Sequence, residues 1–245
     1  MNFSKAPITE VVFDIQAVLP QGFDYRQFEE YHKTLENDFP TKEVAVQYEA
    51  SIEFKKDEEP AYGTKGGANG FHFKSVDGKK ILQFKNSGFT FNKLKPYQNW
   101  ETFSSEAKKH FEEYIRIAQP IKIIRVGLRY INKLEIPLPI QSLKEYITTV
   151  PTFENNVPSN MDEFFMRLVV PYAEDPTVKA IITEAMLKTD PAGNVLPIIF
   201  DIDVFKEDNF ELDIEKIYNT FDTLRNYKNF IFLSSITDKM KKLII

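Results

Sequence analysis

One segment near the middle of the chain, residues 121–136, limits the fold more than any other. Apolar side chains occupy every second position over most of its length, namely Ile124, Val126, Leu128, Tyr130, Leu134 and Ile136. Polar side chains and one glycine lie between them, namely Arg125, Gly127, Arg129 and Lys133. A period of two is typical of a β-strand with one buried and one polar face. The segment therefore predicts a long strand whose polar face carries two arginines.

The same two periodicities predict the other elements. Alternating or short apolar runs predict further strands, over 8–18, 43–54, 71–74, 81–84, 89–91, 164–173, 177–188 and 194–206. Apolar stripes at helical spacing predict helices, over 24–39, 99–118, 140–148, 213–227 and from about 237 onward. The pair Asp77-Gly78 is a type I′ hairpin signal between two of the strands. Residues 55–70, with four of the nine glycines, are predicted to be a loop.

The order of these elements indicates the fold class. Strand, helix, four strands and helix are followed by strand, helix, three strands and helix. Antiparallel meanders with segregated helices are typical of an α+β fold, and the one-sided helices are expected to pack on one face of the sheet. The two halves, 1–119 and 120–245, share a pattern but no sequence identity. We therefore interpret the chain as one compact unit with an internal pseudo-repeat.

Composition excludes several classes of protein. The 245 residues include no cysteine, which rules out a disulfide framework, a thiolate metal site and a cysteine nucleophile. The chain starts without an apolar signal core, and no run approaches the ~20 apolar residues that span a bilayer. The net charge of −5 disfavours general nucleic-acid binding. We expect a cytoplasmic protein without a cofactor and without membrane association.

Arg125 and Arg129 are the first candidate site. Arginines four residues apart in a strand share a face, and Gly127 leaves room between them. At about 3.3 Å per residue, Gly127 lies about 6.6 Å along the strand from Arg125. Arg129 lies the same distance beyond Gly127, on the same face. Such a pair can bind an anionic ligand, contact a partner or form ion pairs inside the chain. The intramolecular bridge is the simplest interpretation, and the other two stay open.

Asp201 and Asp203 are the second candidate site. They point to one face of a predicted strand whose other face is apolar. Neighbouring carboxylates can hold a divalent metal, as in metal-dependent nucleases, although that chemistry needs a third acid that the sequence does not identify. A solvated or ion-paired face is the simpler interpretation, and the two arginines are its natural partners.

Other catalytic patterns are missing from the sequence. The glycine-rich stretch 63–70 lacks the Walker spacing and is not followed by a predicted helix. The three histidines, His32, His72 and His110, are isolated and lack metal-ligand spacing. No Gly-x-Ser-x-Gly elbow is present. No assembled catalytic signature emerges.

Several segments together resemble a sporadically distributed family of uncharacterised bacterial proteins. They span the chain and are 6–15 (APITEVVFDI), 125–132 (RVGLRYIN), 199–205 (IFDIDVF), 224–226 (LRN) and 236–238 (ITD). The resemblance implies no established activity and transfers no catalytic residue. The patchy distribution of that family is what mobile or anti-phage defence loci show, and this link is associative.

These observations favour a non-catalytic binding or regulatory protein that recognises a protein partner. By association, the resemblance favours a bacterial anti-phage defence or toxin-control operon as the setting, with the partner encoded alongside. The alternative is a sensor or enzyme for a small, nucleotide-like anion held by Arg125 and Arg129. A metal-dependent nuclease that uses Asp201 and Asp203 is a third interpretation. Homo-oligomerisation stays open.

Overall fold

The computed structural model describes residues 5–53, 61–152, 161–189 and 193–245. Its strands form one antiparallel sheet in the order β2-β3-β4-β5-β1-β6-β9-β8-β7. The α+β fold that the sequence predicted is confirmed. The strands are β1 (Ile8–Val18), β2 (Thr41–Glu53), β3 (Ala61–Lys74), β4 (Lys80–Lys85), β5 (Gly88–Leu94), β6 (Lys122–Pro137), β7 (Phe165–Pro171), β8 (Val178–Met186) and β9 (Val195–Phe210).

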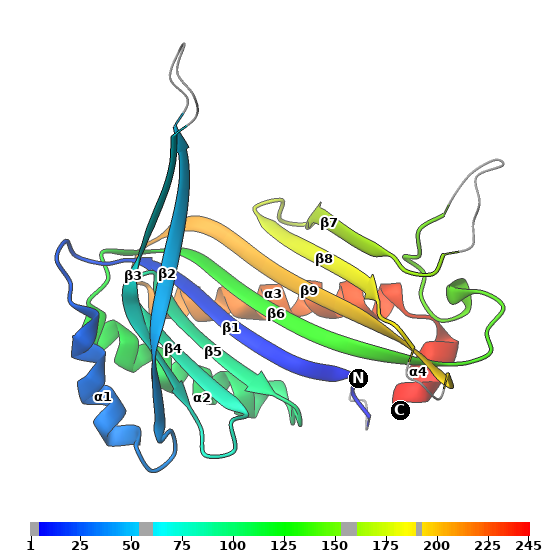
Figure 1. Ribbon diagram of the computed structural model, residues 1–245, viewed down its shortest axis with the longest axis horizontal. Coiled ribbons are helices and arrows are strands. Elements are labelled where there is room, and N and C mark those ends of the chain that lie inside the picture. The colour runs from blue at the N-terminus through cyan, green and yellow to red at the C-terminus, as the bar shows by residue number, and fades with distance from the viewer. Residues whose placement is uncertain (1–4, 54–60, 153–160, 190–192) are drawn as a thin grey trace.

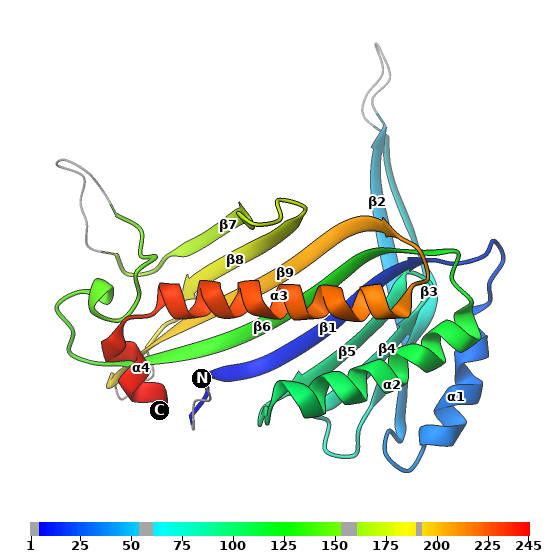
Figure 2. The same ribbon diagram turned by 180° about the vertical axis from the view of Figure 1, so that it is seen from behind.

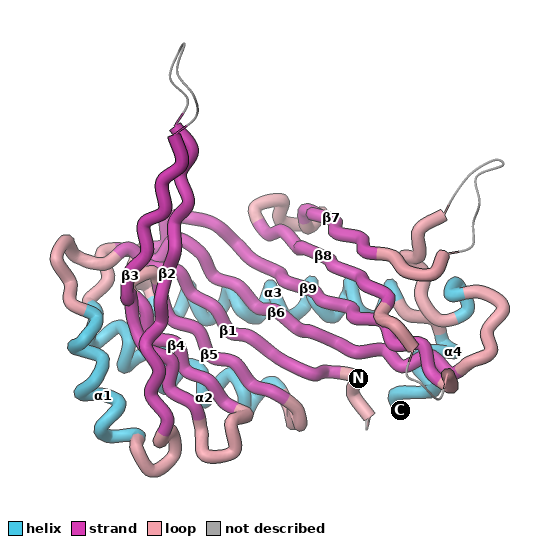
Figure 3. Tube along the Cα trace, viewed as in Figure 1, coloured by secondary structure: helices cyan, strands magenta, loops and turns pink. Residues whose placement is uncertain are grey.

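The described helices lie on one face of the sheet. They are α1 (Phe28–Leu35), α2 (Trp100–Ala118), α3 (Ile214–Ser235) and α4 (Asp238–Ile244), with short 3-10 turns η1 (Tyr25–Gln27) and η2 (Leu143–Glu145). The three longer helices lie behind the sheet in Figure 1 and in front of it in Figure 2, with α3 running along the central strands. No described helix covers the opposite face, which we call the open face. Beyond the main sheet, β2 and β3 continue as a two-stranded arm (Figure 3).

The core fills the space between the helices and the sheet. Apolar strand residues at alternate positions pack there, as the period of two requires. On β1 they are Val11, Phe13, Ile15 and Ala17. Phe13 stacks on Phe221 of α3 at 3.8 Å between ring centroids, which fastens the longest helix to the middle of the sheet. The polar residues that alternate with this row on β1, such as Asp14, lie on the open face.

A bulge changes the alternation at the start of β6. The β6–β9 register shifts between Ile123 and Arg125, so Ile123 is fully buried and Ile124 is not. The prediction that placed Ile124 in the apolar row was therefore wrong. An extra residue in one strand reverses the alternation locally. From Val126 onward the predicted row is correct.

The glycine-rich stretch is a strand and not the predicted loop. Residues 61–70 belong to β3 and pair with β2, while 54–60 lie outside the described residues. Pairing with β2 orders this glycine-rich stretch. The ring of Tyr48 on β2 covers Gly66, where a Cβ would lie 2.4 Å from the ring. At Gly70 a Cβ would lie 2.1 Å from the Phe84 carbonyl oxygen, so the strands approach closely there.

Three smaller predictions also differ from the structure. The helix expected over 140–148 is only the η2 turn. The helix expected to end near 227 continues to Ser235, because the apolar run 230–233 extends its buried side. The Asp77-Gly78 turn is not type I′, since only Gly78 has positive φ; its amide donates to the Ser75 carbonyl oxygen at 2.8 Å.

The two halves of the chain occupy the two sides of one sheet. The first half provides β2-β3-β4-β5-β1 and the second provides β6-β9-β8-β7, so they meet at the β1–β6 ladder. Between β6 and β7 the described residues hold no α-helix that would match α1. The pseudo-repeat stays a prediction, with Gln119 as the left-handed cap of α2 at its boundary.

Candidate functional site

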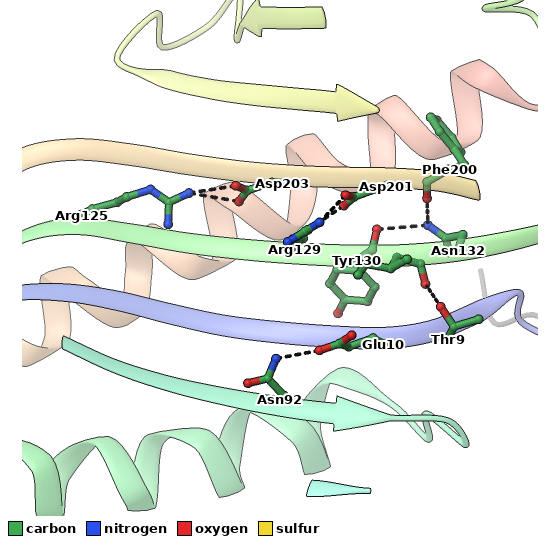
Figure 4. Close-up of polar contacts among 11 residues, drawn as sticks. Thr9, Glu10, Asn92, Arg125, Arg129, Tyr130, Asn132, Phe200, Asp201 and Asp203 are labelled. Atoms are coloured by element: carbon green, nitrogen blue, oxygen red, sulfur yellow. Dashed lines mark hydrogen bonds and ion pairs between the residues drawn. The ribbon is translucent and has the colours of Figure 1, made fainter. Parts of the chain in front are cut away.

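The structure brings the four predicted site residues together on the open face (Figure 4). β6 carries Arg125 and Arg129, and its neighbour β9 carries Asp201 and Asp203. The ladder sets Arg129 opposite Asp203, yet Arg129 pairs with its diagonal neighbour Asp201. Arg125, whose ladder partner is Glu207, extends past Gly127 and pairs with Asp203. Diagonal neighbours are within reach of long side chains.

Arg125 is held between two carboxylates. Its Nη1 lies 2.6 Å from Asp14 Oδ2, and its Nη2 lies 2.9 Å from Asp203 Oδ2. The guanidinium also lies 4.7 Å from the centroid of the Phe205 ring. It passes over Gly127, where a Cβ would be only 2.6 Å from Nη1, so glycine is the residue that fits. Arg125 thereby ties β1 and β9 to β6.

Arg129 forms a two-pronged pair with Asp201. Its Nε and Nη2 donate to the two carboxylate oxygens at 2.8 and 2.6 Å. The arginine side chain is 45% exposed while the aspartate is 12% exposed. The hydrogen bond to Asp201 raises the pKa of Arg129 above its ordinary value. Burial raises the pKa of Asp203, with Arg125 and Arg129 opposing that shift.

These contacts agree with the intramolecular bridge among the interpretations of the two arginines. Both positive charges are neutralised inside the chain, and Arg125 has little exposure left for a ligand. Sequence reasoning missed Asp14, whose alternation with Phe13 and Ile15 places it on this face and was the signal available. In the described part of the chain, no three His, Asp or Glu side chains are grouped as a metal site.

A cavity of about 590 Å³ adjoins this network where the arm leaves the sheet. Asp14, Tyr48, Asn69, His72 and Lys85 are among its lining residues. Burial lowers the pKa of both His72 and Lys85. Lys85 donates to Gln83 Oε1 at 2.9 Å, a neutral partner. The cavity is polar but holds no pair of acid and base in hydrogen-bond contact.

The edge strand β7 is the second feature of functional interest. Phe165 is 71% exposed, Leu168 41% and Val169 54%, and Arg167 provides the only charge within β7. Natural edge strands are usually protected by charges, proline or short length. Here the proline, Pro171, comes only at the end.

The hydrogen-bond alternation shows which backbone groups of β7 face outward. Met186 N–H donates to Phe164 C=O, and Tyr172 N–H donates to Val178 C=O, both toward β8. Because the direction alternates along an antiparallel strand, the even-numbered residues face β8. The backbone groups of Phe165, Arg167 and Val169 therefore point away from the sheet.

Comparison of the chain with protein-family models, with curated proteins and with solved structures finds no match. The family resemblance therefore stays a prediction. Among the described helices, none combines the length and the apolar character needed to cross a membrane.

Proposed function

We propose that this chain is a non-catalytic binding module that recognises a protein partner by adding a strand of that partner to β7. The proposal rests on the backbone N–H and C=O groups of β7 that point away from the sheet, on an edge strand rich in apolar residues. Strand addition at a free sheet edge is a common mode of peptide recognition, in which the main chain supplies affinity and alternate side chains supply specificity.

The chemistry of β7 describes the partner segment. On the open face, Phe165 and Val169 flank Arg167, and β8 adds Ile181 and Thr183 beside them. Among the described residues no carboxylate forms an ion pair with Arg167. The fitting occupant is an extended segment of another protein that alternates apolar residues with an acidic residue opposite Arg167.

Site-specific crosslinking in the source cells tests the proposal. The photoreactive phenylalanine analogue p-benzoylphenylalanine replaces Phe165 on β7 or, as a matched control, Phe230, which is 64% exposed on α3. We expect a discrete crosslinked product of one other protein from position 165 and none of that mass from position 230.

Two variants at one position separate backbone pairing from side-chain contact. Val169→Pro removes an outward N–H without touching the β8 ladder, and proline is tolerated on edge strands. Val169→Thr keeps that N–H. We expect the product to disappear with Val169→Pro and to persist with Val169→Thr, at unchanged melting temperatures. A product that survives Val169→Pro, or one with twice the mass of this chain, would refute the proposed mode.

The other interpretations gain no specific support on the open face. An anion held by Arg125 and Arg129 would have to displace Asp203 and Asp201 from them. A metal between Asp201 and Asp203 would compete with the same arginines. The defence or toxin-control setting, with the partner in the same operon, stays a prediction that rests on the resemblance alone.

A further inference from the structure

A second cavity, of about 340 Å³, lies on the helical side of the sheet and shares no lining residue with the arginine–aspartate network or with β7. Its walls come from the segment before β1, the loop after β5, the N-terminus of α2, β6 and the second half of α3. This volume is within the range of small-molecule sites. Its lining includes Tyr97, Trp100, Glu101, Tyr130, Arg225 and Lys228.

Lys228 is a partly buried lysine in this cavity. Its Nζ donates to the neutral side-chain oxygen of Asn229 at 2.6 Å and lies 3.8 Å from the centroid of the Tyr130 ring. No carboxylate of the described residues forms an ion pair with it. A buried ammonium normally has an anionic partner, because desolvation disfavours an isolated charge. Lys228 therefore lacks an anionic partner among the described residues.

Arg225 lies one helical turn before Lys228 and lines the same cavity. Its guanidinium is 5.5 Å from the centroid of the Trp100 ring. Among the described residues it forms an ion pair with Glu101 alone, whose carboxylate is 3.6 Å away and 74% exposed, so the pair is weak. When Lys228 is protonated, two cations against one solvated carboxylate leave a net charge of about +1 at this place.

The N-terminus of α2 reinforces this positive potential. Asn99 caps the helix, and Trp100 and Glu101 of its first turn line the cavity. The first amide groups of a helix and its dipole favour an anion. Aromatic rings form part of the remaining wall: Tyr97 and Tyr130 meet edge to face with their hydroxyl oxygens 3.1 Å apart. An apolar body and one negative charge would therefore both be accommodated.

We infer that this cavity binds a small organic monocarboxylate, with its carboxylate between Lys228 and Arg225 and its apolar or aromatic body against Tyr97 and Trp100. The net charge of about +1 selects a monoanion over a dianionic phosphate ester. The inference concerns a site separate from β7, so it does not depend on the proposed function.

Trp100 makes the test direct, because it is the only tryptophan of the chain and lines the cavity. Titration with benzoate should change its fluorescence in a saturable way, with a dissociation constant on the order of 1 mM for so small a probe. Benzamide, which is neutral and of the same shape, should give no saturation. Inorganic phosphate should bind at least about tenfold more weakly than benzoate.

Matched variants assign the effect to the two cations. Lys228→Met and Arg225→Met should each weaken benzoate binding at least about tenfold, while Lys216→Met, at an exposed position of the same helix, should leave it unchanged. Thermal melting should show that Lys228→Met is folded, since it replaces a buried amine by an apolar chain of similar length. Equal binding of benzoate and benzamide, no saturation with benzoate, or unchanged affinity in Lys228→Met would each overturn the inference.

The pH dependence gives an independent readout. Burial, and then the charge of Arg225, lowers the pKa of Lys228 to about 7. The other groups that face it are Tyr130 on β6, Tyr97 and Glu101, and burial keeps the pKa of both tyrosines above the ordinary value. The carboxylate needs a charged amine, so affinity should be several-fold weaker at pH 8.5 than at pH 6. Lys228→Met should lack this change.

Discussion

Glu184 offers a stability prediction whose size follows from its surroundings. It lies on β8, on the face toward the helices, and is 0% exposed. Thr149 Oγ1 donates to its Oε1, while its Oε2 has no hydrogen-bond partner. Burial raises the pKa of Glu184 from 4.5 to about 6, and the Thr149 hydrogen bond opposes the shift. The folded chain thus holds a proton on this carboxyl more tightly than the unfolded chain does.

The sign and the magnitude follow from proton linkage. Stability from this group is complete below pH 4.5 and is lost as the pH rises through about 6. The loss is about 0.8 kcal/mol at pH 5 and about 2 kcal/mol at pH 8, from 1.36 kcal/mol per pKa unit. Glu184→Gln removes the titration. Its free energy of unfolding relative to the parent should therefore rise by about 1.2 kcal/mol between pH 5 and pH 8.

Urea denaturation at the two pH values measures this difference. The glutamine amide has its own cost, since Oε2 is replaced by an unpaired NH₂ group, but that cost is the same at both pH values. Glu211→Gln, at an exposed position, is the control and should show no such change. A Glu184→Gln difference that is constant from pH 5 to pH 8 would mean that the carboxyl is not desolvated, and the reasoning would fail.

Three further predictions concern the sheet and its core. Gly127→Ala should lower the free energy of unfolding by about 1–3 kcal/mol in urea denaturation, because the added Cβ displaces the Arg125 guanidinium; an unchanged midpoint would contradict this. Arg125→Met should cost about 3 kcal/mol by leaving two carboxylates unpaired, whereas Arg129→Met leaves only the 12% exposed Asp201 unpaired and should cost about half as much; a larger loss from Arg129→Met than from Arg125→Met would refute the assignment. Burial lowers the pKa of His110 to about 4, so stability should fall by up to about 3 kcal/mol as the pH drops from 6.5 to 4, and His110→Gln should remove that component in a pH series of thermal melts.

Much of the open face could be predicted from alternation alone. The polar row of β6 and the pair of aspartates on β9 follow from the period of two, which also made their ion pairing the simplest interpretation. Alternation cannot place a bulge, so Ile124 was assigned to the apolar face in place of Ile123. Propensity cannot find a strand such as β3, since its glycine-rich stretch is ordered by pairing with the neighbouring strand β2.

The Lys228 cavity could not be predicted for a different reason. Its walls come from segments that are far apart along the chain, and neither Lys228 nor Trp100 belongs to a recognisable motif. A lysine on a helix is ordinarily exposed, and only the tertiary packing shows that this lysine is partly buried and forms no ion pair with a carboxylate of the described residues. Such a site can be recognised in the folded structure but not from the spacing of residues along the sequence.

The β1–β6 ladder also sets the order in which a nascent chain can assemble. β1 is complete at Val18, but its partner β6 begins at Lys122, and β9 does not end until Phe210. During synthesis, the first half can form β2 to β5 against one side of β1 while the other side waits for more than a hundred residues. Such long-range pairing slows folding and leaves a transient edge open to wrong partners. During synthesis, β1, which lies at the centre of the finished sheet, is therefore temporarily an exposed edge strand.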